Sequence, residues 1–119
     1  EAGMQGFEDP LNRGTYPWGQ EDSSLLAYFR QLGTLRKQRL SLQCGDIGYL
    51  YAVGGGLVLR RQSEDEVTVA AMNAGMQPLE LSIPWVGALA KDALTGQHFF
   101  ARNGMLRLTL PPVGGVLLV

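Results

Sequence analysis

Hydrophobic and polar residues follow two different rhythms along the chain. Between Asp22 and Arg39 the apolar residues recur every three or four positions, with polar residues between them. This spacing predicts one amphipathic helix. From Gly48 to Val119 the chain has short apolar or alternating runs at intervals of about ten residues, which is the rhythm of β-strands. The apolar stripe of the predicted helix consists of Leu25, Phe29, Leu32 and Leu35.

Turn signals separate the predicted strands. Asn103-Gly104 lies between two such runs and is typical of a tight hairpin, because both residues tolerate positive φ. The fold class predicted is mainly β: an antiparallel β-sandwich of about eight strands, preceded by one α-helix and an irregular N-terminal loop. The strands are expected at 48–53, 57–62, 66–73, 77–83, 91–94, 98–102, 105–110 and 113–119.

The N-terminal stretch from Glu1 to Gly19 has no sustained periodicity and contains several glycines and prolines, so it is expected to be an irregular loop. A loop this long in a compact domain is typical of a binding loop or of a segment separated from its context. Asp9 and Arg13 lie four positions apart in it. Their carboxylate and guanidinium can bind the hydroxyl groups of one ligand, or can form an ion pair with each other.

Composition excludes several classes of function. The chain has 119 residues and a net charge of −1. Nucleic-acid binding requires a basic surface, which this charge balance does not favour. With one cysteine and one histidine, a zinc site of the Cys/His type is not expected. The chain has no apolar run of the roughly 18 residues that a membrane span needs, so we expect no membrane partner. The first residues do not resemble a signal peptide, which favours a cytoplasmic location.

Other residues with chemical potential have simpler structural explanations. Gly54–Gly56 lacks the Lys-Ser/Thr of a phosphate-binding loop and is expected at a hairpin tip. His98, in an apolar strand, is expected to have a structural or surface role rather than a catalytic one. Cys44 is expected in a turn as an inert thiol. The acidic run Glu64–Glu66 between two strands is expected to be a solvated turn.

Several motifs closely resemble a stretch of the α-amylase superfamily of glycoside hydrolases, especially its neopullulanase and cyclomaltodextrinase branch. They are Glu1–Phe7, Asp9-Pro10, Asn12-Arg13 and Thr15–Gly19. The helix segment Leu25–Leu32 and the Leu110–Gly115 pattern also match that family, so the resemblance covers essentially the whole chain. It implies that residues 1–40 are the end of a catalytic (β/α)8 barrel and that residues 41–119 are the C-terminal β-sandwich domain.

The resemblance also implies roles for individual residues. Asp9 and Arg13 correspond to sugar contacts on the non-reducing side of the scissile bond, and Tyr16 and Trp18 line or support that wall. None of the family's catalytic carboxylates maps onto this chain. A retaining glycosidase needs two carboxyl groups about 5–5.5 Å apart. We therefore expect the parent enzyme to cleave α-glucosidic bonds and this chain alone to be inactive, with no cofactor or metal.

The expected partners are an α-glucan or maltooligosaccharide in the parent and the rest of the catalytic barrel. The helix stripe Leu25, Phe29, Leu32 and Leu35 would pack on the barrel in the parent, so in this chain the helix and loop are expected to dock either onto the sandwich or onto a second copy, by self-association. The alternative function is a stand-alone carbohydrate-binding β-sandwich that uses Trp85, Phe99 and Phe100 as a stacking platform. The structural role predicts instead that these three rings are mostly buried.

Overall fold

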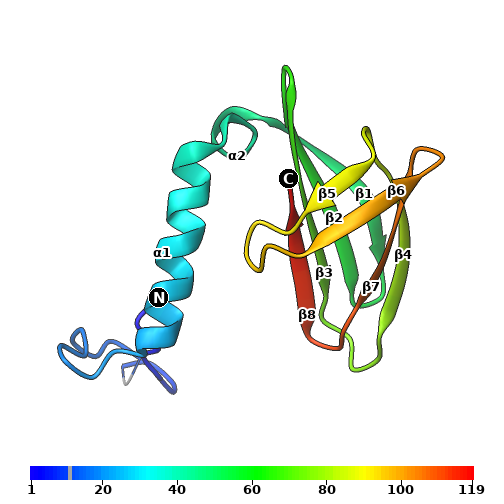
Figure 1. The fold of residues 1–119 in the computed structure, drawn as a ribbon. Helices are drawn as coiled ribbons and strands as arrows, with labels where there is room; N and C mark the ends of the chain where they lie inside the picture. The colour runs from blue at the N-terminus through cyan, green and yellow to red at the C-terminus, as the bar shows by residue number, and fades with distance from the viewer. Residues whose placement is uncertain (11) are drawn as a thin grey trace. The chain divides into compact units, whose positions relative to one another are not determined.

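The computed structural model describes residues 1–10 and 12–119. Within them the chain forms two helices and eight strands (Figure 1). The helices are α1 (Ser23–Gln38) and α2 (Leu40–Cys44). The chain divides into two compact units, Glu1–Arg36 and Lys37–Val119. The two units are described separately below.

The first unit consists of an N-terminal loop and most of α1, and the ends of the loop meet at the start of that helix. The backbone N–H of Asp22 donates to the carbonyl of Ala2 at 3.0 Å, and Ala2 is buried. The Asp22 carboxylate then caps the helix, because its Oδ1 accepts the backbone N–H groups of Ser24 at 3.0 Å and Leu25 at 2.9 Å. A hydrogen bond from the Ser24 hydroxyl, together with the Leu25 N–H, holds the pKa of Asp22 below its ordinary value.

The second helix was not expected from the sequence. The helix predicted to reach Arg39 ends at Gln38, and α2 follows after one residue, from Leu40 to Cys44. Five residues are too few to show a helical period, so the hydrophobic pattern gives no signal for α2. Cys44 therefore ends a short helix instead of lying in a turn, and it is exposed.

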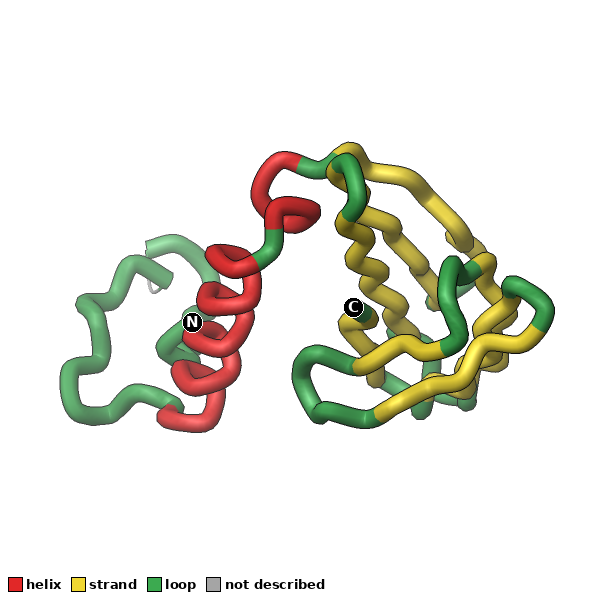
Figure 2. Tube along the Cα trace, turned by 45° about the horizontal axis from the view of Figure 1, so that its top comes forward, coloured by secondary structure: helices red, strands yellow, loops and turns green. Residues whose placement is uncertain are grey.

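Two four-stranded sheets make up the rest of the chain, as Figures 1 and 2 show. The first sheet has the order β1-β2-β3-β8 and the second the order β4-β7-β6-β5, with every neighbouring pair antiparallel. This arrangement confirms the predicted antiparallel β-sandwich. The strands are β1 (Asp46–Val53), β2 (Gly56–Ser63), β3 (Glu66–Asn73), β4 (Leu79–Pro84), β5 (Leu89–Lys91), β6 (His98–Arg102), β7 (Met105–Leu110) and β8 (Gly114–Leu118).

The core lies between the two sheets and is formed by alternate residues of their strands. In β7, for example, Leu106, Leu108 and Leu110 are buried while the residues between them are exposed. The buried apolar residues from both sheets form one cluster: Val58, Val69, Ala71, Leu81, Ile83, Ala90, Leu106, Leu108, Leu110 and Leu118. This continuous packing holds the sandwich together.

A buried carboxylate links the two sheets. Asp92 follows β5 in the second sheet, and its Oδ1 accepts the backbone N–H of Leu117 in β8 of the first sheet at 3.0 Å. It also accepts the hydroxyl of Thr95 at 2.6 Å and the N–H of Leu94 at 3.2 Å. Burial raises the pKa of Asp92, but these hydrogen bonds outweigh burial and leave the pKa below its ordinary value.

The predicted turns are confirmed by the backbone angles. Asn103 and Gly104 join β6 to β7 with φ values of 52° and 72°, as a tight hairpin of this type requires. Gly54, at the tip between β1 and β2, has φ 56°. The triple glycine is therefore a hairpin tip, as expected.

Candidate functional site

Asp9 and Arg13 bind each other in the N-terminal loop. The Nε of Arg13 lies 2.7 Å from Asp9 Oδ1, and its Nη2 donates to Oδ2 at 3.0 Å. The backbone N–H of Arg13 donates to the carbonyl of Pro10, also at 3.0 Å. Both charged side chains remain largely exposed, at 75% for Arg13 and 58% for Asp9. The paired groups can therefore still offer oxygen lone pairs and N–H donors to a hydroxyl-bearing ligand.

Tyr16 and Trp18 form an aromatic pair in the same loop. Their ring centroids lie 4.5 Å apart with the planes inclined by 53°. Trp18 is 82% exposed and Tyr16 is 40% exposed. The backbone turns tightly here, since the N–H of Trp18 donates to the carbonyl of Tyr16 at 2.9 Å. The pair presents an apolar ring surface to solvent, the kind of surface on which the apolar face of a sugar packs.

Close backbone packing shapes the loop around these residues. A Cβ added at Gly6 would lie 2.8 Å from the Cα of Asn12, so only glycine fits there. This contact brings together the two chain segments that flank Asp9. Specific packing thus determines the conformation of the loop, although its sequence has no periodicity.

Neither a metal site nor a membrane span is visible in the described part of the chain. Within residues 1–10 and 12–119, no three His, Cys, Asp or Glu side chains are grouped so that they could hold a metal ion. Among the helices of those same residues, none is long and apolar enough to cross a membrane.

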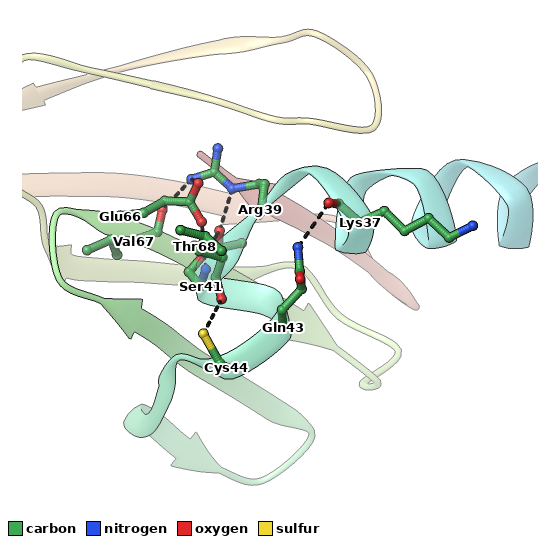
Figure 3. A network of polar contacts seen from close by, with 9 residues as sticks. Lys37, Arg39, Ser41, Gln43, Cys44, Glu66, Val67 and Thr68 are labelled. Carbon is green, nitrogen blue, oxygen red and sulfur yellow. Dashed lines mark hydrogen bonds and ion pairs between the residues drawn. The ribbon is translucent and has the colours of Figure 1, made fainter.

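A polar network that sequence reasoning missed ties the start of the second unit to the first sheet (Figure 3). The Nε of Arg39 donates to the hydroxyl of Thr68 at 2.7 Å, and its Nη2 donates to the carbonyl of Val67 at 2.9 Å. Ser41 donates to Glu66 Oε1 through its backbone N–H at 2.7 Å and through its hydroxyl at 2.6 Å. The sequence gives only a weak indication of this network, because the hydrogen-bond partners lie more than twenty positions apart.

Glu66 is therefore not part of a solvated turn, as the acidic run predicted. Glu64 and Asp65 do form the turn between β2 and β3, but Glu66 begins β3 and receives the hydrogen bonds of Ser41. The hydroxyl and backbone N–H of Ser41, and to a smaller extent the charge of Arg39, hold the pKa of Glu66 below its ordinary value. The Arg39 to Glu66 ion pair measures 3.8 Å.

The three aromatic rings of the alternative stacking platform do not lie on one face. Trp85 and Phe99 pack against the core, and the Nε1 of Trp85 donates to the carbonyl of Leu89 at 3.1 Å. Phe100 is 73% exposed, which corrects the expectation that all three rings are mostly buried. Its neighbour Phe99 pairs with buried Ala90, so the alternation of β6 turns Phe100 outward. The proposed platform is thus divided between the core and the surface.

The outer face of the first sheet is unusually apolar. Strand register places Leu59 of β2 beside Tyr49 and Ala70, and Leu57 beside Met72, all on the side away from the core. Ile47, Tyr49 and Met72 are exposed by 58%, 72% and 39%. We call this surface the apolar sheet face and define it by Ile47, Tyr49, Ala52, Leu57, Leu59, Arg61, Ala70, Met72 and Leu117.

Arg61 is the charged member of the apolar sheet face. It lies between Ile47 and Thr68 in the strand register. Its Nε is buried, and no acceptor for it is found among residues 1–10 and 12–119. A buried donor without a partner costs about 1–3 kcal/mol. The face thus combines exposed apolar surface with an unsatisfied charged group.

The outer face of the second sheet is largely polar instead. Ser82 pairs with Arg107 and Glu80 with Thr109, all exposed. The apolar residues on this face gather toward one end of the sheet: Pro84, Leu89, Phe100 and Met105. This alternation between a buried and a wet side is typical of a sheet that faces water.

The known proteins that are similar to this chain are enzymes of the family that the sequence motifs resemble. No protein-family model matches the chain. The cyclomaltodextrinase of Geobacillus thermopakistaniensis is 33% identical over 124 residues, covering 98% of this chain and 21% of that enzyme. Neopullulanase 2 of Thermoactinomyces vulgaris is 30% identical over 130 residues, covering 99% of this chain and 21% of that enzyme. The α-amylase of Geobacillus thermoleovorans, solved with acarbose, superimposes with a TM-score of 0.87 at 26% identity. The match covers 99% of this chain and 27% of that enzyme.

The antiparallel sandwich with a preceding helix and these matches together show that the chain is similar to C-terminal domains of glycoside hydrolases. The chain matches the C-terminal domains of the α-amylase family. Within that family its sequence relatives include a cyclomaltodextrinase and a neopullulanase, which confirms the branch that the sequence motifs indicated. The chain spans about a fifth of the length of these two enzymes, at 21% each. In these relatives the matching segment is part of a larger chain.

Proposed function

We propose that the chain is the C-terminal part of an α-glucan-acting hydrolase and that its sandwich stabilises the catalytic barrel of that enzyme. The apolar sheet face carries this proposal. Monomeric proteins rarely leave a large contiguous apolar surface open to water, and this face is contiguous across β1, β2, β3 and β8. A barrel that covers it would recover the hydrophobic energy of that surface.

Arg61 fits the same role. An arginine at the centre of an apolar contact is a frequent anchor of interfaces, because its guanidinium can bind a carboxylate through two parallel hydrogen bonds. The chain itself covers the Nε, so the terminal guanidinium nitrogens of Arg61 are the donors that a partner on the barrel would reach. We propose a carboxylate of the barrel as the partner.

In this proposal residues 1–40 complete the barrel and residues 41–119 form the supporting domain. The parent cleaves α-glucosidic bonds in an α-glucan or maltooligosaccharide by a retaining mechanism, with both catalytic carboxylates on barrel strands that precede this chain. Asp9 and Arg13 bind sugar hydroxyls, and Tyr16 and Trp18 form the wall beside them. Their exposure and pairing support this assignment.

We also propose that the chain alone self-associates through the α1 stripe. No residue of α1 is buried, and Phe29 is 41% exposed. Sedimentation should show that Phe29→Lys reduces association, whereas Ala27→Lys on the opposite side of the helix does not. Equal sedimentation of both variants and the wild-type chain would contradict this part of the proposal.

A graft tests the main proposal. This chain replaces the matching segment of the Geobacillus thermopakistaniensis cyclomaltodextrinase, and cyclomaltodextrin hydrolysis and thermal stability are compared with the enzyme that lacks the segment. We expect the graft to recover folding and activity, and the 119-residue chain alone to show none. Activity of the isolated chain, or a graft no more stable than the truncated enzyme, would overturn the proposal.

A further inference from the structure

The inner face of β2 changes from apolar to polar along the strand. Val58 is fully buried in the core, but the next two inward positions are Arg60 and Gln62, and both are exposed. The register places Arg60 opposite Val69 and Gln62 opposite Val67 on that inner face. Polar residues at core-facing positions break the pattern that specifies a sandwich, and such breaks occur mainly at functional sites.

A groove of about 840 Å³ lies where these side chains point. Its apolar wall is formed by residues of the first sheet and of the segment after β4, among them Leu50, Val67, Val69 and Trp85. A neighbouring hollow of about 390 Å³ shares Arg60, Gln62 and Glu64 with it. Pockets that bind small ligands fall in this range of volume and combine an apolar lining with a few convergent polar groups.

The polar groups of the groove are available to a ligand. Among residues 1–10 and 12–119, the side chains of Arg60, Gln62 and Glu64 make no hydrogen bond or ion pair with one another or with a neighbour. In contrast, the nearby Arg39 and Glu66 are engaged with Thr68 and Ser41. A guanidinium, an amide and a carboxylate thus face the groove with free donors and acceptors.

The chemistry of the lining indicates the class of ligand. The two arginines of the lining, Arg39 and Arg60, face three carboxylates, Glu64, Asp65 and Glu66, and the net charge of −1 does not favour an anion. The groove suits a neutral molecule that both donates and accepts hydrogen bonds. Trp85 adds an aromatic wall, and its hydrogen bond to the Leu89 carbonyl at 3.1 Å fixes the ring. A molecule with hydroxyl groups on its edges and an apolar face is a sugar.

We propose that this groove is a glycan-binding site of the sandwich, separate from the Asp9 and Arg13 pair of the loop. Arg60, Gln62 and Glu64 bind the hydroxyl groups of the ligand, and Trp85 packs against its ring. The ligand is an oligosaccharide of α-linked glucose. That choice of sugar rests on the proposed function, whereas the glycan class follows from the groove.

The two tryptophans of the chain allow a direct test. The ¹⁵N-labelled chain is titrated with maltoheptaose, and the indole N–H signals of Trp85 in the groove and Trp18 in the loop are followed separately. We expect the Trp85 signal to shift and saturate. Arg60→Ala is expected to weaken this binding about ten-fold, because it removes a charged hydrogen-bond donor. Arg107→Ala, on the polar outer face of the second sheet, is the matched control and should leave the affinity unchanged.

Each alternative result has a defined meaning. A Trp85 signal that does not respond to maltoheptaose overturns the groove assignment, and a response at Trp18 alone does so while leaving the proposed function intact. A Trp85 response that Arg60→Ala does not weaken overturns the role of the polar groups. An equal response to cellohexaose, which is β-linked, overturns the choice of α-linked glucose. The spectrum of each variant shows that its fold is retained.

Discussion

The two outer faces of the sandwich are made by antiparallel sheets of four strands each, but they carry opposite kinds of side chain. Leu59 of the first sheet and Thr109 of the second both lie on outward positions, where Leu59 is half-buried and Thr109 is exposed. On the second sheet the outward residues are mostly charged or hydroxylated, as expected of a surface in water. On the first sheet the outward residues are mostly apolar. The difference supports the proposal that the catalytic barrel covers the outer side of the first sheet.

The largest expected effect comes from breaking the link between the two sheets that are being compared. Asp92→Ala removes the carboxylate that accepts the backbone N–H groups of Thr95 and Leu117. We expect a loss of about 3–5 kcal/mol in the free energy of unfolding, measured with urea. Asp65→Ala, in the exposed turn between β2 and β3, is the control and should cost less than about 0.5 kcal/mol. Similar losses for both variants would show that Asp92 does not hold the sheets together.

A smaller effect is expected from Glu66→Gln, at the polar end of the first sheet's outer side, where Ser41 of α2 is bound. The variant loses the negative charge that receives two hydrogen bonds from Ser41. Because the site is partly exposed, we expect the free energy of unfolding at pH 7 to fall by only about 1–2 kcal/mol. The pKa of Glu66 is lowered in the folded chain from about 4.5. Its contribution is therefore complete above the unfolded-state pKa and is lost as the pH falls through the folded-state value.

Urea unfolding at pH 7 and pH 3 of wild type and variant measures this dependence. The stability difference between the wild-type chain and Glu66→Gln should shrink at the lower pH. A difference that stays constant, or that grows as the pH falls, would contradict the assigned network.

The smallest expected effect is that of Arg61→Met, whose stability change should have opposite signs in the isolated chain and in the grafted enzyme. In the isolated chain Arg61→Met removes a buried Nε that has no acceptor among the described residues, so we expect stability to stay equal or rise by about 1 kcal/mol. In the grafted enzyme the same change removes the proposed partner of a barrel carboxylate and should lower stability. Thermal unfolding of both proteins checks this reversal. The same sign in both would show that Arg61 has no partner on the barrel.

Much of the fold could be predicted from the sequence because it depends on local signals. The alternation of Leu106, Leu108 and Leu110 and the Asn103-Gly104 turn each specify their element within a few residues. The missed features depend on distant partners. Asp92 acquires its role only when β8 lies beside it, although the spacing of Asp92 and Thr95 is a turn signal.

The candidate sites were predictable to different extents. The loop residues carried a motif that named Asp9 and Arg13 as candidates, and their ion pair is one of the two arrangements expected from their spacing. The apolar sheet face carried a partial signal. Leu57-Val58-Leu59 is apolar at consecutive positions, which indicates a strand covered on both sides. The register with β1 and β3 was needed to show which residues form one surface. The exposure of Phe100 was likewise decided by register and not by residue type.

The central claim, that the apolar sheet face is covered by a catalytic barrel, is tested most directly in the grafted cyclomaltodextrinase with one lysine on each outer face. Leu59→Lys places a charge in the proposed contact, whereas Thr109→Lys places the same charge on the face that is already wet. The account predicts that Leu59→Lys lowers the melting temperature by several degrees, corresponding to about 3 kcal/mol, and that Thr109→Lys changes stability by no more than about 0.5 kcal/mol. Equal melting temperatures for the two variants would contradict it.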